Sequence, residues 1–503
     1  MYKKFDYIVM GSGMGGLAIA ALLAKAGKTV CVVEAHSTIG GHAHTFVEGD
    51  YRFCHDVQYL MGCHKGGLMH RFLKRLGLNE KIKFRPIDSK YLDYINRKED
   101  VFKIHRGSKE YERGLCSLFP QERENISGYF KIQRRIFHES HYNDYVVPPL
   151  HIFTRPVSFF YILKYAKYTL HQMFEKFKFS PRLRSILSGR MLNLALKPSE
   201  ASFLLYAGME QAYAQSGHYP IRGMHFLLDE IAKVINKKGQ ILCNTKVLSI
   251  NTEGGGVHSV TTTTGDLFSD HFVSDIDPQA TFRLIRPGSV GERYTKKFDY
   301  TYSDSIVWLY LGLKNTASVM QKFPRANIWH QTSFDEEKNY EQSLLGNYRH
   351  ASIFITAASL HTQPGVYAPK DGMTLEIASI ANYALFRKLF KKDKKAYDAL
   401  VKKVRNDVIK ILEEYYFPDI KKHIDVEIIH TPIDMQRIVN APYGNTYGYR
   451  MTPWQSIFGH FTVQKTFFGN LNFVGASVSY PGVHGSILGA MTLFKKLKTG
   501  IEY

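Results

Sequence analysis

The sequence predicts an α/β protein that begins with a strand–helix–strand unit. Residues 6–10 are apolar and β-prone, and residues 17–25 are rich in Ala and Leu, as expected of a buried helix. Gly27 is a typical helix stop, and residues 29–33 form a second apolar, β-branched run. The chain therefore opens with a βαβ unit, the building block of a parallel sheet.

Length and composition indicate a folded protein of several domains. The 503 residues correspond to about three units of roughly 150 residues each. The hydrophobic fraction of 44% and the charged fraction of 22% exclude a disordered chain. None of the five cysteines forms a CxxC pair, which argues against a disulfide framework or structural zinc and fits a reducing compartment. No apolar run is long enough to span a bilayer and no signal peptide is visible, so we expect a cytoplasmic protein associated with membranes peripherally.

A glycine-rich turn joins the first strand to its helix. Residues 11–16, Gly-Ser-Gly-Met-Gly-Gly, have the GxGxxG spacing that permits a tight turn and close approach to a diphosphate. The positive end of the helix dipole favours the phosphate charge. Glu34 closes the second strand, where its carboxylate is placed to accept hydrogen bonds from ribose hydroxyls. The pattern predicts a dinucleotide site.

A second loop follows this acid and indicates which dinucleotide is bound. Ala35 comes directly after Glu34, and the pair Gly40-Gly41 precedes His42. A Gly-Gly pair at this distance is expected where the second ribose and phosphate of a long, extended dinucleotide pass another loop. This arrangement is typical of proteins that bury FAD, so FAD is the expected cofactor.

At this point the chain resembles the phytoene desaturase, carotenoid isomerase and retinol saturase family of FAD-dependent oxidoreductases. Lys197–Phe203 is most similar to the retinol saturase and carotenoid isomerase branch. The other segments that carry the resemblance are His218–Met224, Asn244–Val247, Val273–Pro278, Leu471–Ser477 and Pro481–Ser486. These segments lie at both ends and in the middle, so the resemblance covers nearly the whole chain.

The resemblance implies that residues from distant parts of the chain hold the cofactor. The adenine would lie near Val247, the pyrophosphate and ribityl chain near Gly475, and the pyrimidine edge of the flavin near residues 483–485. The last helix opens there, and its N–H groups would stabilise negative charge on reduced flavin. The expected cofactor-binding residues are Gly11, Ser12, Gly13, Met14, Gly15, Gly16, Glu34, Ala35, Gly40, Gly41, His42, Val247, Gly475, Ala476, Val483, His484, Gly485 and Ser486.

Two departures from the family pattern supply the candidate catalytic residues. His484 stands where the family commonly has Pro, and it is expected either to contact the flavin or transfer a proton, or simply to pack. Residues 53–59 lack the glycine of the family's Phe-Asp-x-Gly-x-x-Tyr segment, so the chain is expected to pass the isoalloxazine differently. His55, Asp56 and Gln58 then either line the substrate end of a tunnel or cap a loop.

His42 and His44 form an HxH pair, which raises the question of a metal site. We find no carboxylate nearby in the sequence whose spacing completes a two-His-one-carboxylate set. The pair also falls on the expected phosphate loop, so no metal is predicted. GxSxG, HExxH and Walker A motifs are absent, which argues against acyl transfer, zinc hydrolysis and nucleotide hydrolysis.

Residues 145–178 are rich in aromatic residues and lysine, and the chain has a formal net charge of +21. Three interpretations stay open. The stretch is a helical lid that takes a long apolar substrate from a membrane surface, a docking site for an acidic acyl carrier protein, or the core-facing stripe of an ordinary helical subdomain. No nucleic-acid recognition motif accompanies the charge, so nucleic-acid binding is not expected.

We therefore expect a Rossmann-type FAD-binding domain in three parts, residues 1–85, 216–290 and 436–503. It is interleaved with a helical substrate, lid or membrane-facing region (86–215) and a mixed-sheet substrate-binding domain (291–435). Within the last domain, residues 307–313, 352–356 and 373–379 are predicted strands, and residues 393–416 are a predicted charged helix.

By resemblance, the expected function is desaturation, saturation or isomerisation of double bonds in a long hydrophobic polyene, carotenoid- or retinoid-like, by hydride exchange at flavin N5. A flavin-dependent desaturase or reductase of fatty-acyl chains is the alternative enzyme. A non-catalytic FAD- or lipid-binding protein is the alternative of another class. The sequence indicates no oligomeric state.

Overall fold

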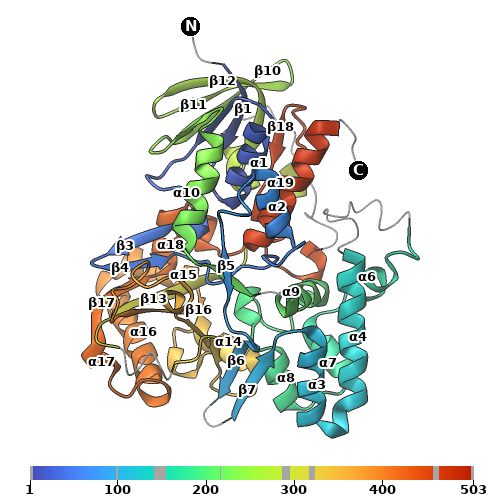
Figure 1. Cartoon of the computed structure of the whole chain (residues 1–503), viewed down its shortest axis with the longest axis vertical. Helices are drawn as coiled ribbons and strands as arrows, with labels where there is room; N and C mark the ends of the chain where they lie inside the picture. Colours follow the sequence, from blue (N-terminus) through green and yellow to red (C-terminus); the bar gives the residue numbers. More distant parts are fainter. Residues whose placement is uncertain are drawn as a thin grey trace.

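The computed structural model describes residues 4–97, 100–140, 155–215, 217–285, 295–316, 323–456 and 464–499. Two seven-stranded sheets and a group of helices form the main regions of the fold (Figure 1). The sheet that carries the glycine-rich turn lies at the top of Figure 1, the second sheet at the lower left, and the helices at the lower right.

The first sheet, here called the nucleotide sheet, has the strand order β10-β11-β12-β1-β2-β9, with β18 beside β12. Its strands are β1 (Phe5–Met10), β2 (Val30–Val33), β9 (Gln240–Leu242), β10 (Val247–Glu253), β11 (Gly256–Thr262), β12 (Gly265–Ser274) and β18 (Leu471–Phe473). β1 runs parallel to β2 and β12, whereas β10, β11 and β12 form an antiparallel meander. The predicted Rossmann-type unit is confirmed, and it is assembled from segments far apart in the sequence.

Helices cover one face of the nucleotide sheet. Alternate β1 residues Tyr7 and Val9 join a hydrophobic cluster with these helices, while Ile8 and Met10 point into a separate cluster on the opposite face. The helices are α1 (Met14–Lys25), α2 (Leu68–Leu76), α10 (Gly223–Ile235) and α19 (Gly482–Thr499). Because α19 packs beside α1, the late part of the chain lies next to the glycine-rich turn.

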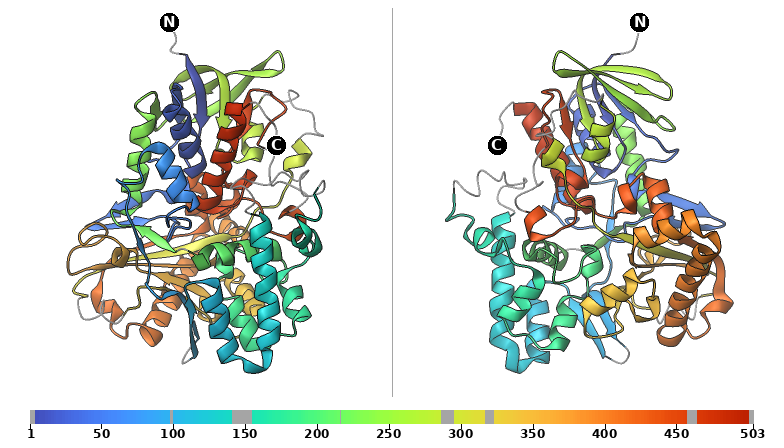
Figure 2. Two further views of the ribbon diagram at one scale, coloured as in Figure 1. Left: turned by 45° about the vertical axis from the view of Figure 1, so that its right-hand side comes forward. Right: turned by 180° about the vertical axis from the view of Figure 1, so that it is seen from behind.

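The second sheet has the order β17-β13-β16-β15-β14-β6-β7 and is antiparallel except for the β14–β6 pair. Its strands are β6 (Tyr91–Arg97), β7 (Asp100–His105), β13 (Ser305–Leu313), β14 (Asn327–His330), β15 (Ile353–Thr356), β16 (Met373–Ala381) and β17 (Ile424–His430). Every residue of β13 and β16 is buried. α16 (Lys394–Tyr415) packs on one face, as the second view of Figure 2 also shows. The predicted strands and the charged helix are confirmed.

The middle of the chain forms helices that pack on the other face of the second sheet. They are α3 (Ser108–Leu118), α4 (Arg123–Ser140), α6 (Phe160–Tyr165), α7 (Leu170–Lys176), α8 (Pro181–Leu187) and α9 (Phe203–Gln215). The region 86–215, predicted to be helical, begins with two strands, because β6 and β7 extend the second sheet. Their sequences hid this, since β6 buries the charged Asp93 and lacks a clean apolar alternation.

Smaller elements complete the part of the chain that the structure describes. The hairpin of β3 (Thr45–Glu48) and β4 (Tyr51–Cys54) follows the 3-10 turn η1 (Gly41–Ala43). The remaining elements used below or seen in Figure 1 are β5 (Phe84–Pro86), β8 (His218–Pro220), α11 (Pro278–Arg283), α14 (Glu336–Leu344), α15 (Tyr383–Lys392), α17 (Ile420–His423) and α18 (Pro432–Val439). Among the described helices, none combines the length and the hydropathy needed to cross a bilayer.

The aromatic, basic stretch falls only partly within the described residues, since its positions 145–154 lie outside them. Phe159 and Ile162 are buried in the core that the helices share with the second sheet, whereas the Phe160 side chain is 52% exposed. Residues 159–162 therefore do not form a continuous exposed aromatic run. In the short helix α6, Ile162 faces the core and Phe160 faces solvent.

Candidate active site

The glycine-rich turn is compact because neighbouring backbone segments touch. A Cβ on Gly16 would stand 2.2 Å from the carbonyl oxygen of Gly11, and Gly11 itself has a φ of +96°. Gly40 lies against the turn, where its N–H donates to the carbonyl of Ser12 at 2.9 Å. The two glycine loops predicted from the sequence therefore lie side by side at the carboxyl ends of β1 and β2.

Glu34 is fixed beside this turn by three hydrogen bonds to its carboxylate. One oxygen accepts from the Ser12 N–H at 2.9 Å and from the Ser12 hydroxyl at 2.5 Å, and the other accepts from the His36 N–H at 2.9 Å. The backbone of Glu34 also bonds to Leu242 and Thr245, so the chain leading to Val247 passes the same point. Glu34 is buried, and its acceptors lie next to the helix N-terminus.

Asp275 occupies the centre of the site, and sequence reasoning missed it. Its carboxyl group accepts hydrogen bonds from the backbone of Gly16 and Gly13. A Cβ on Gly13, Gly15 or Gly475 would stand between 2.4 and 2.6 Å from its oxygens. The segment that contains Asp275 was among those carrying the family resemblance, but nothing in its spacing indicated that this side chain faces the glycines.

Burial raises the pKa of Asp275 to about 7, because an ionised carboxylate is poorly solvated there. The hydrogen bonds from Gly16 and Gly13 act in the opposite direction, and the nearby Glu34 raises the pKa further. The first turn of α1 contains no acidic residue of its own. Because Asp275 is partly protonated near neutral pH, it repels an anionic ligand at the helix N-terminus, such as a diphosphate, less than a fully ionised carboxylate would.

The late segments complete the same site. The Val474 N–H donates to the Ser274 carbonyl at 2.9 Å, which places Gly475 against Gly15. Ala476 begins the next 3-10 turn, and residues 483–486 form the first turn of α19. The expected cofactor residues are therefore gathered along one path, from the β2 end past the glycine turn to α19.

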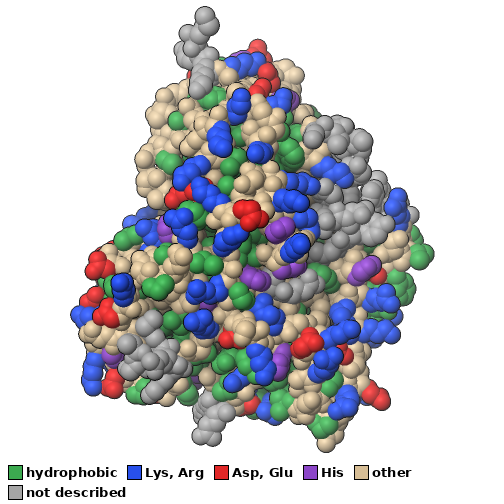
Figure 3. Space-filling view, viewed as in Figure 1, with side chains coloured by type: hydrophobic (Ala, Val, Ile, Leu, Met, Phe, Trp, Pro, Cys, Tyr) green, Lys and Arg blue, Asp and Glu red, His purple; other side chains and the backbone are tan. Residues whose placement is uncertain are grey.

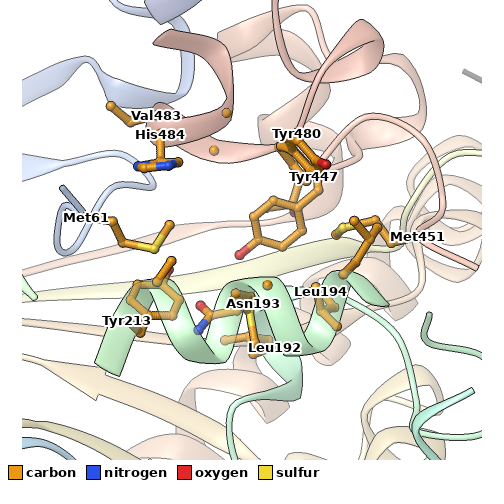
Figure 4. A pocket seen from close by; sticks show the side chains of 18 of the residues that line it. Met61, Leu192, Asn193, Leu194, Tyr213, Tyr447, Met451, Tyr480, Val483 and His484 are labelled. Atoms are coloured by element: carbon orange, nitrogen blue, oxygen red, sulfur yellow. The ribbon is translucent and has the colours of Figure 1, made fainter. Parts of the chain in front are cut away.

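A cavity of about 270 Å³ adjoins the start of α19. Val483 and His484 lie across it from Tyr213 of α9, with Met61 between them (Figure 4). Its other apolar walls come from α4, α6, α9, the second sheet and the segments around residues 192–194 and 447–451. They include Ile136, Ile162, Leu192, Leu194, Met209, Ile306, Trp308, Trp329, Phe354, Tyr447 and Met451. Such a space accommodates a long apolar group.

Few polar side chains face this cavity. Asp56, Gln58, Asn193 and His484 are among them. Asn193 donates to the Tyr59 hydroxyl at 3.3 Å. Burial raises the pKa of that hydroxyl well above its usual value, so it stays protonated. A molecule bound in this cavity would therefore be held mainly by its shape and by apolar contacts.

His55 is the candidate residue that does not reach the cavity wall. Its ring is fully buried and stacks on His44, with centroids 4.7 Å apart, and lies 5.3 Å from the ring of His430. The backbone explains this, because the His55 N–H donates to His44 and the Asp56 N–H donates to His42, which continues the β3–β4 ladder. Asp56 reaches the cavity wall and His55 stays in the interior, although the His55 Nδ1 lies only 3.8 Å from the Asp56 carboxylate.

Asp56 links this histidine cluster to the second sheet. One carboxylate oxygen is hydrogen-bonded to the His42 ring, and the other accepts from the Trp308 indole N–H at 2.6 Å. Burial alone would raise the pKa of Asp56, but His42 and His55 hold it well below its usual range. Burial, followed by the neighbouring His55, lowers the pKa of His44 and of His430 to about 4, so both rings are neutral at pH 7.

No metal is predicted for the His42/His44 pair, and the structure instead brings His42 together with His55 and Asp56. One ligand atom from each of these three residues lies within 4.8 Å of the others. The β3–β4 hairpin brings the residues after β4 next to those before β3, so Asp56 lies beside His42 although 14 residues separate them in the sequence. His44 is not part of the set, because its Nδ1 is hydrogen-bonded to the Gly41 carbonyl at 2.7 Å.

Comparisons with known proteins agree with the fold. A family model described as an NAD(P)-binding Rossmann-like domain matches residues 9–76. The all-trans-retinol 13,14-reductase of Danio rerio is 26% identical over 97% of this chain and 85% of that protein. The chloroplastic prolycopene isomerase of Daucus carota is 22% identical over 89% of this chain and 72% of that protein. A solved structure of a putrescine oxidase mutant covers all of both chains with a TM-score of 0.66 at 12% identity.

The relatives that align over most of this chain are a reductase and an isomerase, so the chain is an oxidoreductase of this class, and its Rossmann-type domain fits a flavin or nucleotide cofactor. Within this class, the chain is similar to retinol reductases and carotenoid isomerases, so the family resemblance predicted from its motifs is confirmed.

Proposed function

We propose that the protein is an FAD-dependent oxidoreductase that saturates, desaturates or isomerises double bonds of a long hydrophobic polyene, of carotenoid or retinoid type. The observation that carries the proposal is an apolar cavity that begins at the first turn of α19 and continues between α9 and the second sheet. The names of the relatives, a retinol reductase and a prolycopene isomerase, support polyenes as the substrate class.

The residues along the path described above fit FAD. We assign the adenosine ribose to Glu34, the adenine to the backbone near Val247, and the diphosphate to the turn at residues 11–16 together with residues 40–42. Gly475 and Ala476 follow along the ribityl chain. Asp275 fits beside the diphosphate because its raised pKa reduces the repulsion between two anions.

Bound FAD would supply the hydride donor and acceptor chemistry. The chain's own contribution is to orient the substrate, exclude water and stabilise charge. The N–H groups of the first turn of α19, from Val483 to Ser486, lie where negative charge on a reduced flavin would be stabilised by the helix dipole. His484 faces the cavity and is the proposed proton-transfer residue, whereas the His55 ring does not reach it.

The largely apolar wall sets how the substrate is held. Because the aromatic and aliphatic side chains of α9 and the second sheet offer few hydrogen bonds, a polyene would be positioned by shape and by contact with rings such as Trp308 and Tyr447. Substrates with a charged group at the reacting end would lose hydration without compensation.

We further propose that the substrate enters from a membrane surface. Two segments line the cavity on one side and expose apolar residues on the other. α6 contributes Ile162 to the wall and leaves Phe160 exposed, and Ser456 lies on the wall two residues after Trp454, which is 71% exposed. Lys and Arg side chains are spread over the whole face seen in Figure 3, so attraction to anionic headgroups would not be confined to one patch.

The proposed function is tested with the purified protein. Denaturation should release FAD at about one equivalent per chain. With a carotenoid or a retinoid in detergent under anaerobic conditions, a saturase should reoxidise its reduced flavin, a desaturase should reduce its oxidised flavin, and an isomerase should change the isomer composition of the polyene. Release of NADP without flavin would refute the assignment of the cofactor. Reoxidation by a fatty-acyl thioester but by no polyene would move the substrate to acyl chains.

Membrane entry has a separate test, co-sedimentation with anionic and neutral liposomes at low and high salt. We expect F160D/W454D to reduce binding to both kinds of liposome, and K164E/K167E to reduce binding to anionic liposomes at low salt only. Wild-type protein that sediments with no liposome but binds an acidic acyl carrier protein would instead support carrier docking.

A further inference from the structure

The cluster at the base of the β3–β4 hairpin has a donor set that the proposed flavin chemistry does not use. It offers two imidazole nitrogens, from His42 and His55, and one carboxylate oxygen, from Asp56, all within 4.8 Å of one another. Metal–ligand bonds of about 2.0–2.2 Å would require the donor atoms to approach to roughly 3–4 Å. Small side-chain rotations achieve this, because His55 Nδ1 already lies 3.8 Å from the Asp56 carboxylate.

His55 points to a ligand independently of this spacing. Its side chain has no exposed surface, and neither ring nitrogen has a hydrogen-bond partner among the described residues. Either neutral tautomer leaves one N–H and one lone pair unsatisfied in the interior, which is costly. The hydrogen bond between His42 and Asp56 accounts for those two side chains, whereas the His55 ring approaches the Asp56 carboxylate only to 3.8 Å.

The surroundings are those of a built site. The hairpin ladder fixes the backbone of all three residues, through the N–H of His55 to His44 and the N–H of Asp56 to His42. Trp308 holds the second carboxylate oxygen of Asp56, and the Tyr310 hydroxyl donates to the His55 carbonyl at 2.5 Å. Bonds to the outer atoms of ligating residues orient metal ligands in the same way.

We propose that His42, His55 and Asp56 bind one first-row divalent transition-metal ion, such as Zn(II), Co(II) or Fe(II). Two imidazoles and one carboxylate favour these ions over Mg(II) or Ca(II), which prefer all-oxygen ligands. Three protein ligands leave coordination positions open. Since Asp56 borders the cavity, those positions are accessible to water or to a polar group of a molecule within it.

The test uses the flavin-loaded enzyme without a histidine tag, treated with a chelator and then titrated with Zn(II) by calorimetry. Wild type should bind one Zn(II) per chain, and His42→Ala, His55→Ala and Asp56→Asn should each weaken binding by at least about tenfold. His258→Ala is the matched control, because this histidine is exposed and remote from the cluster, with a side chain that is 57% exposed. Absence of saturable binding in wild type, or unchanged binding in His55→Ala, would overturn the proposal.

Because the His55 side chain is fully buried, the folding of His55→Ala is checked by circular dichroism and flavin content. If it does not fold, His42→Ala decides the result, since the His42 side chain is 34% exposed. X-ray absorption at the zinc edge of the loaded wild type should show nitrogen and oxygen ligands with two imidazoles. A zinc–sulfur shell would assign the bound metal to a cysteine and overturn the site. Flavin content is measured on the same samples. Bound flavin without zinc binding would contradict this proposal alone, whereas absence of flavin would contradict the proposed cofactor.

Discussion

The nucleotide sheet and the second sheet are the same size but are held together by different chemistry. Around the first, the decisive contacts are backbone groups meeting at glycines, with Glu34 and Asp275 as the side chains that join them. Around the second, buried side chains from distant helices and strands make the contacts. Arg190, for example, lies between Asp93 of β6 and Glu210 of α9 with all three side chains buried.

The difference indicates which kind of substitution each region tolerates least. A backbone-built site fails when atoms are added, because no space exists for a Cβ. A side-chain-built core fails when atoms or charges are removed, because a partner is left unpaired in the interior. Four predictions test this contrast.

The largest effect is expected in the second region, from Arg190→Met. Removing the guanidinium leaves Asp93 and Glu210 buried without their cation, which should lower the free energy of unfolding by about 3–5 kcal/mol. Urea unfolding followed by circular dichroism measures this change. The control Arg113→Met breaks an exposed ion pair with Glu110 and should cost less than about 1 kcal/mol. Equal losses in the two variants would show that burial of the Arg190 ion pairs adds nothing to their contribution to stability.

In the nucleotide sheet, the added methyl of Gly13→Ala should be enough to impair cofactor binding. Its Cβ would stand 2.4 Å from an Asp275 oxygen, and relieving an overlap of this kind costs about 1–3 kcal/mol. Flavin retained after gel filtration should fall by about tenfold or more. Gly469→Ala is the control, since a Cβ there meets no atom within 4 Å. Full retention by Gly13→Ala would show that the diphosphate binds elsewhere.

Glu34→Ala sharpens the comparison, because here a side chain serves a backbone-built site. The variant leaves the Ser12 and His36 donors without their acceptor and removes the proposed ribose ligand. We expect a loss of about 1.5–3 kcal/mol in stability, together with weaker FAD retention. Thermal unfolding and flavin content check both. Glu253→Ala, at an 80% exposed side chain, is the neutral reference, and a Glu34 variant that matched it would contradict the assignment.

The last prediction concerns Asp275, and its effect appears only when the pH is changed. Its folded-state pKa is raised to about 7 from a usual value of 3.8, so folding favours the protonated form. The stability it contributes is present below pH 4 and is lost as pH rises toward 7. Relative to Asp275→Asn, flavin-free wild type should lose about 2 kcal/mol between pH 5 and pH 7. Denaturant midpoints for the two proteins at several pH values measure this difference. Parallel pH profiles would show that Asp275 is ionised throughout.

The sequence predicted the parts of the fold that depend on local spacing. The glycine turn, Glu34 and the strands at 307–313 and 373–379 follow from chain distance and residue type alone. β6 was missed because Asp93 is buried through its pairing with Arg190, a partner 97 residues away. The approach of His42 to Asp56 was missed for a similar reason, since only the pairing of β3 with β4 closes the distance.

Asp275 shows a second limit of predicting the candidate site from the sequence. Its neighbours in the sequence identify a family turn, but its role depends on three backbone segments meeting around one carboxyl group. Composition and periodicity carry no information about such a meeting. The membrane-facing role of residues 145–178 stays a prediction, although the burial of Phe159 and Ile162 narrows the surface that is able to perform it.

The pairing of β18 with β12 has a consequence for how the protein is made. Phe272 to Ser274 align with Leu471 to Phe473, and Gly475 then meets Gly15, which precedes it by 460 residues. Contacts of such long sequence separation form slowly, because the entropy of closing a large loop is lost before the contacts contribute any stabilisation. A ribosome-bound chain that has completed the first βαβ unit still lacks the other half of its nucleotide pocket. Cofactor loading is therefore expected to follow the synthesis of nearly all of these residues and to act as a late, kinetically controlled step of maturation.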